Sequence, residues 1–148
     1  MRWRSVTAAL VPELDVSDLD QAIAFYVGVL GFRVHYARAE ERFAYLEREG
    51  AEVMLEEAAG PGRRFRTAPL ERPYGRGVNL QIRTTDARIL HAAVAAGAPL
   101  IIDLEECWYR HDAQEAGNRQ FVVADPDGYL LRFFEDLGSR PGSRPSPG

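Results

Sequence analysis

Residues 11–32 read VPELDVSDLDQAIAFYVGVLGF, and this stretch decides the fold. A strand-like segment over residues 8–16 leads into Asp18, whose side chain can cap a helix. Gly31 tolerates a positive φ and therefore predicts the end of that helix. The apolar positions between them recur at helical spacing: Leu19, Ile23, Tyr26 and Leu30. Three short strands are predicted after the helix, over residues 32–38, 43–47 and 51–57.

The same order of elements recurs from residue 77, in GVNLQIRTTDARILHAAVAAGAP. A strand over residues 78–84 precedes a second capping residue, Asp86, and a helix that ends at Gly97. Strands are predicted over residues 100–104, 119–124 and 129–135, the last two joined by an Asp-Pro-Asp-Gly turn. The two capping residues lie 68 positions apart. The sequence therefore predicts a βαβββ unit that occurs twice around a shared cleft. A single α+β sandwich with accidental spacing is the alternative.

Composition divides the chain into four segments. The first module covers residues 1–58 and the second covers residues 77–137. Between them, residues 59–76 (AGPGRRFRTAPLERPYGR) carry five arginines among glycines and prolines, which predicts a flexible linker or lid. The basic residues in this segment are interpreted as a solvated loop. Residues 138–148 (GSRPGSRPSPG) predict a disordered tail.

Composition also excludes several classes of function. The net charge of −4 argues against nucleic-acid binding. All 18 basic residues are arginine, so the sequence has no lysine for Schiff-base chemistry or for a Walker-type phosphate loop. Cys107 is the only cysteine, so neither an intrachain disulfide nor a Cys-rich zinc site can form. No apolar run predicts a membrane span or a signal peptide. Cytoplasmic residence is expected.

Three segments carry a resemblance to a known family. Residues 11–32, 77–99 and 118–136 (NRQFVVADPDGYLLRFFED) resemble, in this order, the module openings and the closing hairpin of the vicinal oxygen chelate superfamily. This superfamily includes glyoxalases, bleomycin-resistance proteins and extradiol dioxygenases. The resemblance implies α+β architecture, with paired βαβββ modules that form a curved, incompletely closed β-barrel. It also implies a homodimer, in which the N-terminal strand is sometimes exchanged.

Enzymes of this superfamily hold a divalent metal with His, Glu or Gln side chains. The resemblance places the four ligand positions of this chain at Val11, Leu55, Val78 and Arg132, and a slip of one residue would replace Leu55 with Glu56. Aliphatic side chains and a guanidinium cannot bind a cation, so we expect neither a metal nor another cofactor. The histidines are interpreted as surface or packing residues: His35, His91 and His111.

With the metal-dependent enzymes disfavoured, the chain most resembles the bleomycin-resistance branch of the superfamily, in which a cleft sequesters an aromatic drug. Residues 105–121 (EECWYRHDAQEAGNRQF) are similar to that branch, and Trp108 and Tyr109 offer flat faces for stacking. Phe43 and Tyr45 are candidate aromatic walls from the first module. Nearby carboxylates include Glu105, Glu106, Asp112 and Glu115. The alternative is that Trp108 belongs to the core.

Arg132 constrains the chemistry of the ligand. A guanidinium that faces a barrel interior is costly to desolvate, so it requires a carboxylate partner such as Glu56 or Glu115, or an anionic group of the ligand. An Arg132 without such a partner argues against a cationic drug.

The predicted function is sequestration of a small aromatic ligand or antibiotic, without metal and without chemistry. One alternative is a glyoxalase- or dioxygenase-like enzyme, either with shifted metal ligands or with Glu56 or Glu115 as a base. Another is an interaction module whose cleft its own side chains fill. The expected partners are a small molecule and a second copy of the chain, with no nucleic acid and no membrane.

Overall fold

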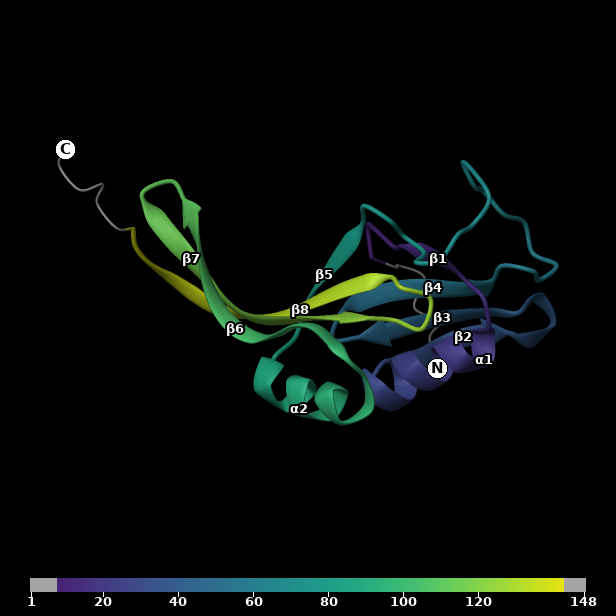
Figure 1. Ribbon diagram of the computed structural model, residues 1–148, viewed down its shortest axis with the longest axis horizontal. Coiled ribbons are helices and arrows are strands. Elements are labelled where there is room, and N and C mark those ends of the chain that lie inside the picture. Colours follow the sequence, from purple (N-terminus) through teal and green to yellow (C-terminus); the bar gives the residue numbers. More distant parts are fainter. Residues whose placement is uncertain (1–7, 143–148) are drawn as a thin grey trace. The chain divides into compact units, whose positions relative to one another are not determined.

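The computed structural model describes residues 8–142, which divide into two compact units (Figure 1). Unit 1 runs to Val78 and also includes Ala124–Leu130, whereas unit 2 covers Asn79–Val123 and continues from Leu131. Each unit has one βαβββ set of elements and one four-stranded sheet. The predicted α+β class and the repeat are therefore confirmed. The assignment of the Asp-Pro-Asp-Gly turn to unit 1 was not predicted.

Unit 1 has the strand order β1-β4-β3-β2, with β1 parallel to β4. Its strands are β1 (Glu13–Val16), β2 (Arg33–Arg38), β3 (Phe43–Arg48) and β4 (Ala51–Glu57). The helix α1 (Leu19–Ile23) continues as a π-helical segment, η1 (Ala24–Val29), and a 3₁₀ turn, η2 (Ala39–Glu41), precedes β3. The first strand is shorter than predicted, because Pro12 has no N–H to donate.

The predicted ends of the first helix are confirmed. Asp18 has extended backbone angles, and its carboxylate accepts a hydrogen bond from the backbone N–H of Gln21 at 3.1 Å. Gly31 has a φ of +81°, a conformation that side chains disfavour, and the chain turns there into β2. One face of the sheet packs against this helix through buried residues: Leu14, Val16, Leu19, Ala22, Tyr26, Leu30, Leu46 and Leu55.

Unit 2 has the strand order β5-β8-β7-β6. Its elements are β5 (Asn79–Arg83), α2 (Ala87–Gly97), β6 (Leu100–His111), β7 (Gln114–Ala124) and β8 (Leu130–Pro141). Asp86 caps α2 by accepting hydrogen bonds from the backbone N–H groups of Arg88 and Ile89. The β6–β7 hairpin extends well beyond α2 (Figure 1).

The prediction of a disordered tail from Gly138 was wrong for residues 138–141, which lie in β8. Backbone hydrogen bonds can continue a strand through Gly, Ser and Pro where a partner strand is present. The Arg140 guanidinium also pairs with Glu115 at 2.8 Å, which fixes the end of β8. Residues 143–148 of the predicted tail lie outside the described residues.

The core of unit 2 lies between α2 and one face of its sheet. Phe121 and Phe133 are fully buried and stack with ring centroids 5.6 Å apart, and the ring of His91, on α2, meets the Phe121 ring edge-on. Phe133 therefore points toward α2, as its position in the predicted strand indicated. No helix within residues 8–142 is long and apolar enough to span a bilayer.

Candidate ligand-binding site

Each sheet has a helical face, packed against its helix, and an opposite face, here called the non-helical face. Because side chains alternate along a strand, the buried residues fix which positions project to each face. In unit 2, Phe121 and Phe133 lie on the helical face, so their neighbours Gln120 and Arg132 project to the non-helical face. The sequence prediction that Arg132 and Phe133 face opposite sides is consistent with this packing.

Tyr109 lies on the non-helical face of unit 2. Its hydroxyl accepts a hydrogen bond from Gln120 Nε2 at 2.7 Å, and the same amide nitrogen donates to Glu105 at 3.1 Å. Cys107 projects between Glu105 and Tyr109, and its hydrogen bond to Glu105 raises the pKa of the thiol. Tyr109 is 43% exposed, so its ring remains accessible while its hydroxyl is held in place.

Arg132 shares this face, but its partner is not the predicted carboxylate. Its Nη2 donates to the side-chain oxygen of Gln81, on β5. Its Nε is buried and has no hydrogen-bond partner within residues 8–142. Glu56 contacts Arg64 instead, and Glu115 pairs with Arg140. A neutral amide leaves the guanidinium charge uncompensated, so an acceptor or anionic group would be favoured beside it.

Trp108 does not share a face with Tyr109, which corrects the prediction that the two rings form one wall. Adjacent residues of a regular strand project to opposite sides, and Trp108 pairs across the hairpin with Gly117. A Cβ at Gly117 would lie 2.5 Å from the indole ring, so only glycine leaves room for the ring. The Arg140 guanidinium lies 3.9 Å from the ring centroid. Trp108 is half-buried and packs against Gly117 and Arg140, so it lies neither in the core nor on the Tyr109 face.

Glu115, the predicted acidic member of the site, lies on the Trp108 face. Its Oε2 accepts a hydrogen bond from Arg140 Nε at 2.9 Å. Trp108, Glu115 and Arg140 thus form a packed cluster at the far end of the β6–β7 hairpin. In unit 2, the structure therefore separates the predicted site residues into two groups, with Tyr109 and Arg132 on the non-helical face.

Phe43 and Tyr45 lie on the non-helical face of unit 1, where they form an aromatic cluster with Tyr36. The Tyr36 and Tyr45 rings stack at 5.1 Å, and the Arg38 guanidinium lies 4.1 Å from the centre of the Phe43 ring. Phe43 and Tyr45 are each only 2% exposed. Tyr36 and Arg38, which sequence reasoning missed, are the less buried members of this cluster.

One of the four metal-ligand positions, Leu55, was assigned in the wrong register. Leu55 is fully buried on the helical face, so the position that projects to the non-helical face is Glu56. Val78 precedes β5, and the residue of β5 that contacts Arg132 is Gln81. Val11 is partly buried and precedes β1. Among the described residues, no three His, Cys, Asp or Glu side chains come together as a cation site.

The three histidines are placed separately. His35 and His111 are exposed on β2 and β6. His91 contacts an Asp103 oxygen at 2.6 Å. The hydrogen bond from the Leu104 backbone N–H and, second, this His91 contact lower the pKa of Asp103.

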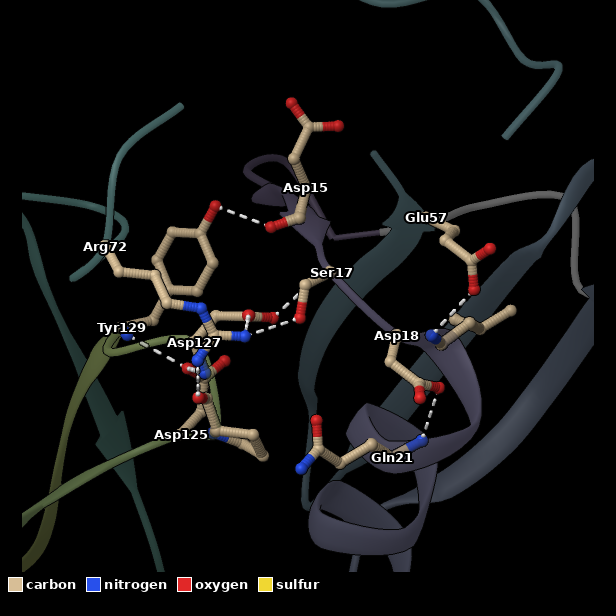
Figure 2. A network of polar contacts seen from close by, with 11 residues as sticks. Asp15, Ser17, Asp18, Gln21, Glu57, Arg72, Asp125, Asp127 and Tyr129 are labelled. Atoms are coloured by element: carbon tan, nitrogen blue, oxygen red, sulfur yellow. Dashed lines mark hydrogen bonds and ion pairs between the residues drawn. The ribbon is translucent and has the colours of Figure 1, made fainter. Parts of the chain in front are cut away.

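The Asp-Pro-Asp-Gly turn lies in a network of polar contacts in unit 1 (Figure 2). Asp127 accepts hydrogen bonds from the Ser17 N–H at 2.9 Å and from Arg72 Nη2 at 3.0 Å. Asp125 accepts from the Tyr26 hydroxyl at 2.8 Å, and burial raises the pKa of its carboxyl. The Tyr129 hydroxyl donates to the Asp15 carbonyl at 2.9 Å. This turn therefore holds the beginning of the first helix.

Comparison with protein families agrees with this architecture. The family model of the Glyoxalase/Bleomycin resistance protein/Dioxygenase superfamily matches residues 10–133. The chain belongs to this superfamily.

Relatives within the superfamily include bleomycin resistance proteins of Geobacillus stearothermophilus and Staphylococcus aureus. Each is 27% identical over 140 residues, which cover 87% of this chain and 97% of the relative. The crystal structure of TioX from Micromonospora sp. ML1 is 25% identical, with a TM-score of 0.66, and covers 86% of this chain and 98% of TioX. TnmS3, an antibiotic binding protein from Streptomyces sp. CB03234, shares the fold at 21% identity and a TM-score of 0.59, over 90% of this chain and 99% of TnmS3.

Sequence reasoning named Glu105 as a nearby carboxylate but missed two glutamines of the non-helical face of unit 2. Gln120 is buried and holds Tyr109, and Gln81 contacts Arg132. The sequence signal that could have found them is the alternation of side chains between the two faces of a strand. If residues 105–111 are read as one strand, Tyr109 shares a face with Glu105, and Trp108 is excluded from it.

Proposed function

We propose that this protein binds a small aromatic ligand on the non-helical face of unit 2 and sequesters it without chemistry. The observation that carries the proposal is the exposed ring of Tyr109, which Gln120 holds on the same face as Arg132. An exposed aromatic ring supplies a stacking surface, and Arg132 supplies a cationic donor for an acceptor group of the ligand. Bleomycin is the first ligand to test, because relatives that match over nearly their whole length are bleomycin resistance proteins. The uncompensated Arg132 nevertheless favours an aromatic ligand with an acceptor or anionic group over a cationic one.

The remaining predicted site residues join the proposal with different roles. Phe43 and Tyr45 are proposed as the rigid base of an aromatic surface on unit 1, with Tyr36 as its accessible member. Trp108 and Glu115 are proposed to stabilise the β6–β7 hairpin. The enzyme alternative has weaker support, because the two candidate bases, Glu56 and Glu115, are both held in ion pairs with arginines. Cytoplasmic residence stays a prediction.

Replacing Tyr109 with alanine is expected to weaken ligand binding by about 1–3 kcal/mol, the cost of losing a stacked aromatic contact. Titration calorimetry with bleomycin measures this change, and repeating it with EDTA distinguishes metal-free binding from metal-dependent binding. Trp108→Ala is the matched control, since it removes the neighbouring aromatic ring from the opposite face. A loss of affinity with Trp108→Ala and not with Tyr109→Ala would place the ligand on the other face. No heat of binding with bleomycin would reject a ligand of this type.

We also propose that the protein forms a homodimer. In unit 2, β6 is an edge strand of 12 residues, and Ile101 and Ile102 on it are 55% and 44% exposed. A long apolar edge strand offers unpaired backbone groups to another chain. Sedimentation equilibrium at tens of micromolar protein should therefore give the mass of a dimer. Ile102→Lys, which places a charge on this edge, should shift the mass toward the monomer, and a wild-type monomer would contradict the proposal.

A further inference from the structure

The predicted linker is fastened to unit 1 by its arginines. Asp15 on β1 and Glu56 on β4 are register partners in the parallel pair, so their side chains project to the same side of the sheet. Arg64 Nε lies 3.0 Å from Asp15 Oδ1, and Arg64 Nη1 pairs with Glu56 Oε1. Arg66 Nε donates to the other oxygen of Asp15 at 2.9 Å. The interpretation of this segment as a solvated loop was therefore wrong for Arg64, whose side chain is only 12% exposed.

These ion pairs are largely removed from water. The side chains of Arg64, Asp15 and Glu56 are only 12%, 16% and 14% exposed. Breaking such a pair leaves a partly buried charge without its partner, which is unfavourable unless the segment moves into solvent. The segment therefore stays packed on the sheet while the ion pairs of Arg64 are intact, and it moves into solvent when they break.

A cavity of about 130 Å³ lies beneath the same segment. Its walls come from β1, β4 and the segment itself: Glu13, Leu14, Asp15, Glu56, Arg63, Arg64 and Phe65. Phe65 is 75% exposed, and the Arg63 guanidinium lies 5.0 Å from its ring centre, so neither residue is anchored in a core. Arg64 is thus the residue of this segment that both lines the cavity and ties the segment to both strands.

We propose that residues 60–66 form a lid over this cavity and that the Arg64 ion pairs with Asp15 and Glu56 hold it closed. Arg64 Nη2 also donates to the Glu57 carbonyl. Loss of either carboxylate partner weakens this set of contacts and opens the lid, while the sheet beneath it stays folded. This inference does not depend on the proposed ligand of unit 2.

Gly62 offers a way to open the lid without changing any charge. A Cβ at this position would lie 2.0 Å from Glu56 Oε1 and 2.8 Å from Arg64 Nη1. The flexible end of Glu56 would have to move away, which separates it from Arg64. Gly62→Ala therefore separates Glu56 from Arg64 by steric means, whereas Asp15→Asn removes the charge that pairs with Arg64 and Arg66.

Limited trypsin digestion tests the lid directly, because trypsin cleaves after arginine and needs a locally unfolded segment. In the wild-type protein, cleavage after Arg63, Arg64 and Arg66 should be slow. Asp15→Asn and Gly62→Ala should accelerate these three cleavages about tenfold or more, as mass spectrometry of the fragments would show. Cleavage after Arg76 is the internal reference and should not change.

Glu71→Gln is the matched control, since it removes a carboxylate from an exposed ion pair with Arg76 at 3.7 Å. It should leave cleavage within the lid unchanged. Equal digestion of Glu71→Gln and both lid variants would overturn the proposal. Equal acceleration after Arg76 and after the lid arginines would also overturn it, because the whole unit would then have loosened. Circular dichroism confirms that each variant is folded before digestion.

Discussion

Phe121→Ala is expected to lower the free energy of unfolding by about 3–5 kcal/mol, the range for truncating a buried phenylalanine. Phe121 is fully buried, and its ring stacks on Phe133 and meets the His91 ring at 5.5 Å. Alanine would leave a cavity that these rings cannot fill, because α2 and the sheet fix their positions. Urea denaturation monitored by circular dichroism measures the loss.

Phe65→Ala provides the matched comparison for Phe121→Ala. Phe65 is 75% exposed, so the same truncation there should change the free energy of unfolding by no more than about 0.5 kcal/mol. Similar losses for the two variants would contradict the placement of Phe121 in the core of unit 2. If Phe121→Ala still binds the ligand at urea concentrations where it remains folded, the core and the proposed ligand surface contribute independently to binding and stability.

Asp127→Ala is expected to cost about 2–4 kcal/mol of stability. The Asp127 side chain is 2% exposed and serves two donors, the Ser17 N–H and Arg72 Nη2 (Figure 2). Alanine leaves a backbone N–H without its acceptor, just ahead of the first helix. Arg72 is 58% exposed and can be rehydrated, so the loss of its pair is the smaller part of the cost. Thermal and urea unfolding measure the change.

Arg72→Gln separates the ion pair of Asp127 from its hydrogen bond to Ser17, and Asp20→Ala serves as an exposed control. Arg72→Gln removes the exposed partner and keeps the Ser17 hydrogen bond, so it should cost less than about 1 kcal/mol. Asp20→Ala removes a carboxylate that is 82% exposed and should have a similarly small effect. If Arg72→Gln were as damaging as Asp127→Ala, the ion pair, and not the hydrogen bond to Ser17, would be the main contribution.

The sequence predicted the architecture well, because its signals are local. Asp18 and Asp86 cap helices, Gly31 ends the first one, and the Asp-Pro-Asp-Gly turn joins the last two strands. Each of these features depends on side chains within a few residues of the position concerned. The repeat of such signals is what identified two βαβββ units.

The candidate site was predicted less well, because its geometry depends on register between distant strands. Leu55 and Glu56 are equally plausible in a sequence alignment, and only the packing of Leu55 under the helix distinguishes them. Trp108 and Tyr109 were grouped by aromaticity, although strand alternation separates them. The lid pair of Arg66 and Asp15 joins residues 51 positions apart, and no local pattern indicates such a contact.

The discontinuity of unit 1 has a consequence for biosynthesis. The Ser17–Asp127 hydrogen bond joins residues 110 positions apart, with all of β5 to β7 between them. A ribosome therefore delivers the first βαβββ set long before the turn that secures the beginning of its helix. During that interval, the Ser17 N–H and the Tyr26 hydroxyl must bond to water or to a chaperone. Completion of the N-terminal unit during translation thus waits for the emergence of residues 124–130, and such long-range closure is slow.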